Sequence, residues 1–191
     1  MSRSMIGGCG RSAAPSLAPM PGASASAGIP ASVSAHRTKC MRKILYNMHF
    51  RSQTSPVVDH SEVVRTTGSA TGCVVSTMIR PSGVQADLKP SDGDLAFFES
   101  ELRVTGPDQF QEDGTIAIGE DSEHLLRFST VGQGHLTLGV EPGMMAGTAS
   151  WKVDGGEGQF AAARGFINST FTIDDTGERS DFHCGLIFLP E

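Results

Sequence analysis

The fold class is decided by two stretches near the C-terminus, which read GFINSTFTI at residues 165–173 and FHCGLIFL at residues 182–189. β-Branched and aromatic residues recur in both, and neighbouring side chains alternate in character. This period of two is typical of a β-strand whose faces differ. The turn cluster Asp175-Thr176-Gly177 separates the stretches, so they predict two short strands joined by a tight turn.

The same pattern continues from residue 41 onward, and no apolar stripe of helical period accompanies it. Turn clusters such as Glu141-Pro142-Gly143 separate the segments. Eight short strands in one domain predict an all-β fold, an eight-stranded antiparallel β-barrel over residues 41–191. Closing the sheet removes the unpaired edges that an open sheet would expose. The predicted strands lie at 42–51, 72–80, 95–104, 114–119, 124–131, 147–153, 165–173 and 182–189.

The two C-terminal stretches also indicate what lies on each side of the barrel wall. A strand that is apolar on one face and small or polar on the other, like 165–173, fits a wall between a core and a partly polar lumen. Such a lumen can be filled by side chains or can hold one small ligand. Apolar residues on both faces of 182–189 fit an oligomer interface about as well, so a homodimer or homotrimer is an open alternative.

Composition argues against several kinds of partner. The chain has 191 residues and a formal net charge of −6, which argues against binding to the nucleic-acid backbone. No run of about 18 apolar residues occurs, so no membrane span is predicted. The four cysteines lie far apart, and neither a CxxC nor an HxH or HxxxH spacing occurs in 41–191. Neither a metal site nor a disulfide framework is therefore predicted.

Residues 1–40 differ from the rest of the chain. They contain four Lys or Arg and no Asp or Glu, and 25 of them are Ser, Ala, Gly or Pro. Such a segment buries too little apolar surface to offset its ordering entropy, so a disordered tail is predicted. The tail fits an organelle transit peptide, and equally an upstream start with Met41 or Met48 as the true initiator of a cytoplasmic protein.

A Gly-rich motif stands between two of the predicted strands. Residues 153–160 read VDGGEGQF and Gly165 follows, which gives the form GGxGxFxxxxG. Upstream, residues 128–136 read FSTVGQGHL, and near the start Tyr46 is followed by Arg51 and by Ser55-Pro56. Together these motifs resemble the allene oxide cyclase family and, more loosely, the dirigent proteins, over residues 41–56 and 124–189.

The resemblance implies an antiparallel β-barrel and a candidate site within it. In plant allene oxide cyclases a Glu, an Asn and a Pro hold an ordered water that contacts the epoxide of the substrate. The similar positions here are Asn47, His49 and Pro56, of which only the proline matches. The resemblance also implies that one face of 42–51 lines the lumen. That face carries Leu45, Asn47, His49 and Arg51, and the outward face carries Ile44, Tyr46, Met48 and Phe50.

His49 is the predicted catalytic base, because a histidine near its ordinary pKa exchanges protons near neutral pH. Arg51 is predicted to stabilise a developing oxyanion, with Asn47 and Glu101 as polar partners. If Glu99 and Glu101 face the lumen, like-charge repulsion makes them an acid–base pair; if they face outward, they are solvated charges. The predicted ligand-binding residues are Pro56, Glu99, Arg127 and His135, whereas His183 is predicted to be a structural wall residue.

These features together predict a cofactor-independent isomerase/cyclase or lyase. It would act on a small, largely apolar organic molecule bound in the lumen, without a metal or an organic cofactor, because the barrel supplies a shaped cavity for the reacting conformer. Two alternatives remain open. One is a non-catalytic carrier that uses the same lumen, and the other is a dirigent-like protein that orients a reactive intermediate made elsewhere.

Overall fold

The computed structural model of the protein describes residues 41–58, 60–119 and 121–191. Within these ranges it contains one short 3-10 helix, η1 (Gly158–Phe160), and no α-helix. None of the described residues therefore form a helix that could cross a membrane. The predicted tail, residues 1–40, lies outside the described residues. The strands are β1 (Met41–Val57), β2 (His60–Ala70), β3 (Cys73–Arg80), β4 (Gly83–Pro90), β5 (Ala96–Gly106), β6 (Gln109–Ile118), β7 (His124–Thr130), β8 (Gly134–Leu138), β9 (Met145–Gly156), β10 (Arg164–Ile173) and β11 (Glu178–Pro190).

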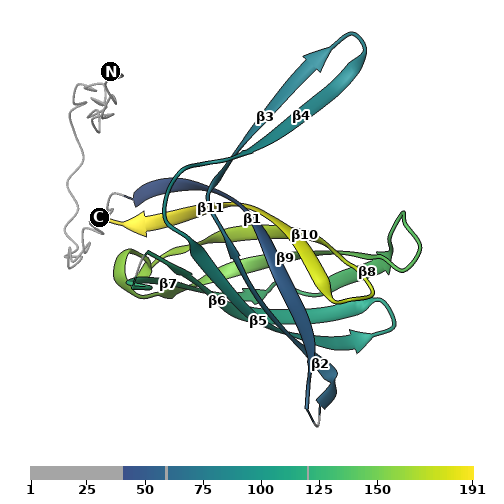
Figure 1. Ribbon diagram of the computed structural model, residues 1–191. Coiled ribbons are helices and arrows are strands. Elements are labelled where there is room, and N and C mark those ends of the chain that lie inside the picture. Colours follow the sequence, from purple (N-terminus) through teal and green to yellow (C-terminus); the bar gives the residue numbers. More distant parts are fainter. Residues whose placement is uncertain (1–40, 59, 120) are drawn as a thin grey trace, which may run out of the picture. The chain divides into compact units, whose positions relative to one another are not determined.

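Eight of these eleven strands form one closed antiparallel barrel (Figure 1). They follow each other in the order β10-β11-β1-β2-β5-β6-β7-β9, and the pairing of β9 with β10 closes the ring. The short strand β8 pairs with β9 and with the start of β6. The predicted all-β fold with an eight-stranded antiparallel β-barrel is therefore confirmed.

One of the eight barrel strands is not the strand that was predicted. β2 stands between β1 and β5 in the ring, although no strand was predicted there. Its inward residues, which include Thr66 and Gly68, are too small or too polar to produce an apolar alternation. The predicted strand 72–80 instead forms β3, which pairs only with β4 in a separate two-stranded sheet. The pattern of that segment is typical of a strand, but it does not reveal which strand will be its neighbour.

Large apolar side chains fill the interior of the barrel. The even-numbered residues of β1 and the odd-numbered residues of β11 point inward, and Phe50 and Ile187 among them are completely buried. Burying one such side chain contributes about 1.5–3 kcal/mol, so this interior supplies most of the driving force for folding. The largest fully buried apolar side chains are Trp151, Phe50, Phe98, Phe110, Phe171, Ile116, Leu126, Ile167 and Ile187.

The Gly-rich motif forms the tight connection between β9 and β10. Gly155 and Gly158 have φ angles of +86° and +59°, left-handed values that glycine adopts without strain. These angles let the chain turn through η1 and bury Phe160, which is 3% exposed. At Gly165 a Cβ atom would lie 2.1 Å from the backbone oxygen of Leu186, so the close pairing of β10 with β11 requires glycine there. The motif therefore has a structural role in this chain.

Two adjacent phenylalanines test which face of β5 points inward. Phe98 is completely buried, and its ring centroid lies 5.4 Å from that of Phe50 and 6.0 Å from that of Trp151. Phe97, which precedes it in the sequence, is 44% exposed.

We expect Phe98→Leu to lower the free energy of unfolding by about 1–2 kcal/mol, because packed aromatic contacts are lost and part of the ring volume is left empty. Phe97→Leu should change it by less than about 0.5 kcal/mol. Urea denaturation measures both, and equal losses would contradict the assigned faces.

Candidate functional site

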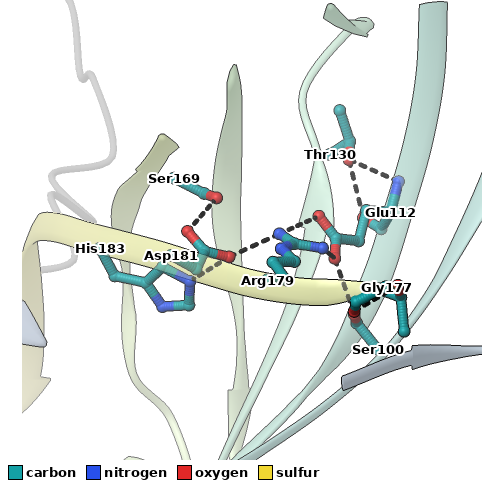
Figure 2. A network of polar contacts seen from close by, with 9 residues as sticks. Ser100, Glu112, Thr130, Ser169, Gly177, Arg179, Asp181 and His183 are labelled. Carbon is teal, nitrogen blue, oxygen red and sulfur yellow. Dashed lines mark hydrogen bonds and ion pairs between the residues drawn. The ribbon is translucent and has the colours of Figure 1, made fainter. Parts of the chain in front are cut away.

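A cluster of charged side chains lies inside the barrel (Figure 2). Arg179, Asp181 and His183 occupy alternate positions of β11, so all three point inward, and each is completely buried. Glu112, which is 1% exposed, meets them from β6, the strand opposite β11 in the ring order. These four residues are called the interior cluster below.

Arg179 holds the interior cluster together. Its Nη1 donates to Glu112 Oε1 at 2.8 Å, and its Nη2 donates to Glu112 Oε2 at 3.3 Å and to Asp181 Oδ2 at 2.5 Å. Its guanidinium carbon also lies 3.8 Å from the centroid of the Phe171 ring, a cation–π contact. Two buried carboxylates thus depend on one cation, so each would be uncompensated without it.

Hydroxyl groups hold the two carboxylates in place. Ser100 Oγ donates to Glu112 Oε1 at 2.7 Å, and Ser169 Oγ donates to Asp181 Oδ1 at 2.7 Å. Thr130 Oγ1 accepts from the backbone N–H of Glu112 at 2.8 Å and donates to its carbonyl oxygen at 2.7 Å. The positions of both acids are therefore set by partners on three other strands, β5, β7 and β10.

His183 joins the interior cluster to the aromatic core. Its Nε2 lies 3.0 Å from Asp181 Oδ2, and its ring centroid lies 4.8 Å from those of both Phe50 and Trp151. Burial disfavours the charged form of Asp181, but the interactions with His183 and Arg179 outweigh it and lower the pKa of Asp181 to about 2. Asp181 is therefore ionised at neutral pH and orients the imidazole through its Nε2 side.

Several fully buried polar atoms around this imidazole lack a hydrogen-bond partner in the described part of the chain. They are the Tyr46 hydroxyl, Trp151 Nε1, Arg179 Nε and both ring nitrogens of His183, of which Nε2 has only its ionic contact with Asp181. The ring centroids of Tyr46 and His183 lie 6.4 Å apart. Burial, followed by the charge of Asp181, raises the pKa of Tyr46 well above its ordinary value, so the hydroxyl remains a donor. An unsatisfied buried polar atom costs about 1–3 kcal/mol, so this arrangement favours a polar partner that reaches these atoms.

The inward face of β1 is the opposite of the one predicted. Tyr46 and Phe50 point into the barrel, so the predicted luminal face is in fact the outer face. Because side chains alternate along a strand, a shift by one residue exchanges the two faces completely. The observed choice buries two aromatic rings and leaves an Arg and a His near water, which costs less than the reverse. The residues wrongly expected in the lumen are Leu45, Asn47, His49 and Arg51.

The predicted base and its partner lie on this outer face. His49 is half-buried, and its Nε2 lies 2.8 Å from Ser180 Oγ. Partial burial, followed by the charge of Arg51, lowers the pKa of His49. Arg51 is exposed and lies 3.6 Å from Glu178 in an ion pair. Asn47 is half-buried on the same face, so none of the three reaches the interior cluster.

The remaining predicted residues also lie outside the barrel core. Arg65 donates to Glu101 at 2.8 Å, and Glu99 is exposed, so the outward interpretation of these two acids is the correct one. Arg127 is exposed and paired with Glu157. Pro56 is exposed near the end of β1.

The outer wall does bring some predicted residues together. Arg51 and Glu99 line one open cleft with a volume of about 500 Å³, together with the exposed ring of Phe97. His135 lines a separate apolar cleft of about 250 Å³ between β8 and β9. Both clefts are open surface depressions, whereas His183 is completely buried. Within residues 41–58, 60–119 and 121–191, no group of three or more His, Cys, Asp or Glu side chains is arranged to hold a metal ion.

Sequence reasoning missed Arg179, Asp181 and Glu112 of the interior cluster and gave His183 only a structural role. Arg179, Asp181 and His183 form the alternating pattern Arg-x-Asp-x-His directly before the apolar run that ends β11. The predicted strand began at residue 182, four residues after the true start at Glu178, and so it excluded two of them. Extending the alternation backwards from Ile187 is the signal that places all three on the buried face. Glu112 lies outside the predicted strand 114–119, and nothing local in its sequence indicates that it is buried.

The fold and the interior cluster define the chain as a closed antiparallel β-barrel with an ionic interior. No protein-family model matches it, and no curated protein matches it either. Among solved structures it is similar to a pterocarpan synthase dirigent protein, with 13% sequence identity and a TM-score of 0.43. That alignment covers 87% of this chain and 98% of the dirigent protein. A likeness this distant carries no argument about function.

The lowered pKa of Asp181 predicts how stability depends on pH. The folded-state pKa of about 2 lies below the ordinary value of about 3.9, so ionised Asp181 stabilises the fold above about pH 4. This contribution, about 2–3 kcal/mol, should be lost as the pH falls from about 4 to about 2. Urea denaturation across that range should show a steeper loss for the wild type than for Asp181→Asn. Parallel pH profiles would contradict the paired state of Asp181.

Proposed function

We propose that the protein binds a small, largely apolar organic molecule inside the barrel and acts on it as a cofactor-independent isomerase/cyclase or lyase. The observation that carries the proposal is the set of unpartnered polar atoms of Tyr46, Trp151 and His183 within an aromatic interior. Aromatic walls with a few convergent polar groups are typical of sites for small organic ligands. Because large side chains fill this interior, the molecule must displace some of them when it enters.

His183 replaces His49 as the proposed base. Its Nε2 lies 3.0 Å from Asp181 Oδ2, so the proposed scheme assigns the N–H to Nε2 and the free lone pair to Nδ1. Nδ1 removes a proton from carbon, and Tyr46 O–H donates to the oxygen on which charge develops. The imidazolium then returns the proton to another atom of the molecule or to a leaving group. Because the proton is only moved, an isomerisation or elimination of this kind needs neither oxidant nor reductant.

Arg179 has a positioning role in this scheme. It binds Asp181 at 2.5 Å and thereby fixes the carboxylate that orients His183. Its Nη atoms contact Glu112 and Asp181 and its guanidinium lies over the Phe171 ring, whereas its Nε has no hydrogen-bond partner among the described residues.

Two non-catalytic alternatives use the same interior. A carrier would bind the molecule and release it unchanged. A dirigent-like protein would orient a reactive intermediate made elsewhere and so determine the stereochemistry of the product.

The experiment that tests the proposal begins with native mass spectrometry of the purified full chain, to identify any molecule that co-purifies. That molecule and a panel of apolar carbonyl compounds, epoxides and terpenoids are then incubated with the protein, and products are followed by chromatography. We expect turnover without added metal or cofactor. Binding without any product would favour the carrier, and a changed product stereochemistry only in the presence of an oxidase would favour the dirigent-like role.

A further inference from the structure

The interior cluster holds more negative than positive charge. Among the buried side chains of the described residues, the charged groups are Arg179, Glu112 and Asp181, with His183 neutral as in the proposed scheme. Arg179 forms ion pairs with both carboxylates, at 2.8 Å to Glu112 and at 2.5 Å to Asp181. One cation cannot neutralise two anions, so an excess of one negative charge remains inside the barrel.

The excess charge lies on the side of His183. Figure 2 shows Asp181 between Arg179 and His183, and Glu112 on the far side of Arg179. Asp181 Oδ2 lies 3.0 Å from His183 Nε2, whereas the Nη atoms of Arg179 contact the two carboxylates. The imidazole therefore faces a carboxylate rather than a cation. A molecule bound against His183 has Asp181 as its nearest buried charge.

The field of Asp181 extends to the hydroxyl of Tyr46, the second polar group of the proposed site. Burial is the main cause that raises the pKa of Tyr46, and the charge of Asp181 is the next. Ionised Tyr46 would be an anion in this interior, and both causes disfavour it. A carboxylate of a bound molecule beside Tyr46 is disfavoured for the same two reasons, because little water screens charges in a buried site.

The unpartnered atoms of the site require a hydrogen-bond acceptor. Trp151 Nε1 is a donor only, and Tyr46 donates its proton in the proposed scheme. A hydrocarbon would leave both donors unsatisfied, which is unfavourable for buried groups. A carboxylate would satisfy them but would add a second negative charge in excess. A neutral carbonyl, epoxide or ether oxygen meets both conditions.

We propose that the interior site selects molecules that are neutral and carry an oxygen acceptor, and that the charge of the interior cluster excludes carboxylates of the same shape. This inference rests on the proposed function, because it describes the molecule that would bind beside His183. Its substrate class is then neutral ketones, aldehydes, epoxides and ethers. The exclusion applies to the molecule as it binds, since charge that later develops on its oxygen is matched by the imidazolium that forms at His183.

Four probes that share a benzene ring and differ in the group attached to it test the proposal with the full chain at neutral pH. They are acetophenone, which is a neutral acceptor, cumene, which is a hydrocarbon of similar shape, benzoate and benzylammonium. Equilibrium dialysis gives the dissociation constants, and the indole N–H signal of Trp151, the single tryptophan, reports by NMR whether a probe binds inside. We expect acetophenone to bind more tightly than either ion. Benzylammonium should bind at least about 10-fold more tightly than benzoate, because an interior without excess charge would disfavour both ions alike.

Two variants separate the effect of the charge from that of the acceptor. Glu112→Gln removes the excess charge and keeps an oxygen that accepts from Arg179, so benzoate should bind about 10-fold more tightly while cumene is unaffected. Asp113→Asn, at the exposed neighbouring position of β6, is the matched control and should change neither. Tyr46→Phe should weaken the binding of acetophenone about 5-fold, the loss of one hydrogen bond, without weakening that of cumene. Circular dichroism verifies that each variant is folded, and if Glu112→Gln is not, the comparison of the two ions in the wild type still decides the effect of the charge.

The outcomes that would overturn the inference differ from the one that would overturn the proposed function. Equal binding of benzoate and benzylammonium inside the barrel, or no gain for benzoate in folded Glu112→Gln, would refute selection by charge. Equal losses for acetophenone and cumene in Tyr46→Phe would refute the required acceptor. In these cases the indole signal of Trp151 still moves, so the interior site stands. If no probe moves that signal, the proposed function itself fails and this inference fails with it.

Discussion

Arg179→Met should lower the free energy of unfolding by about 3–5 kcal/mol, because it leaves Glu112 and Asp181 buried without their shared cation. Arg179→Lys keeps the charge but loses the forked geometry that reaches two carboxylates, and its loss should be intermediate. Urea denaturation at neutral pH gives the values. If Arg179→Met is too unstable to purify, Arg179→Lys alone must still show a clear loss relative to the wild type.

Arg51 provides the matched control for this prediction. It also forms an ion pair across neighbouring strands, but its side chain is 71% exposed and its partner is 3.6 Å away. Exposed ion pairs contribute about 0–1 kcal/mol, so Arg51→Met should have little effect. Similar losses for Arg51→Met and Arg179→Met would contradict the buried position of the interior cluster.

His183→Gln should reduce turnover of any substrate found by the screen by about 100-fold or more, the range typical of a lost general base. The glutamine amide can still donate to Asp181, so the interior cluster keeps a partner at that position and the barrel should remain folded. The measurement is kcat at saturating substrate, with the unfolding transition recorded for the same sample.

His49→Gln is the control for this second prediction. His49 lies on the outer wall against Ser180, so its replacement should leave kcat unchanged. A loss of turnover in His49→Gln with full activity in His183→Gln would restore the originally predicted base and refute the interior site.

The sequence was sufficient to predict the fold class, because alternation and turn clusters repeat along most of the chain. It was insufficient to predict which strands pair with each other. The segment 72–80 has a stronger strand pattern than 60–70, yet the weaker segment belongs to the barrel and the stronger one forms half of the separate β3–β4 hairpin. Alternation describes the two faces of a strand, whereas the choice of neighbour depends on long-range contacts that no local pattern records.

The same limit explains the error on β1. Both faces of 42–51 contain apolar residues, so periodicity alone does not decide which face points inward. The resemblance to allene oxide cyclases implied one face, and the structure has the other. Weighing the area of Tyr46 and Phe50 against the cost of burying Arg51 would have favoured the observed face.

The candidate site was harder to predict than the fold because its parts come from distant segments. Glu112 and Arg179 are separated by 67 residues, and each alone is an ordinary charged residue in a strand. Only the closure of the ring, which sets β6 opposite β11, makes them partners. The Arg-x-Asp-x-His pattern of β11 is the one part of the site that its own strand reveals.

The most direct test of the central claim, that the organic molecule binds inside the barrel, is the fluorescence of Trp151. It is the single tryptophan of the chain, it is completely buried, and its ring centroid lies 4.8 Å from that of His183. Titration with a molecule that the protein binds should change its emission saturably, with the same midpoint as binding measured by equilibrium dialysis. Saturable binding that leaves the emission of Trp151 unchanged would place the molecule on the outer wall, such as the cleft beside Arg51 and Glu99, and would contradict the interior site.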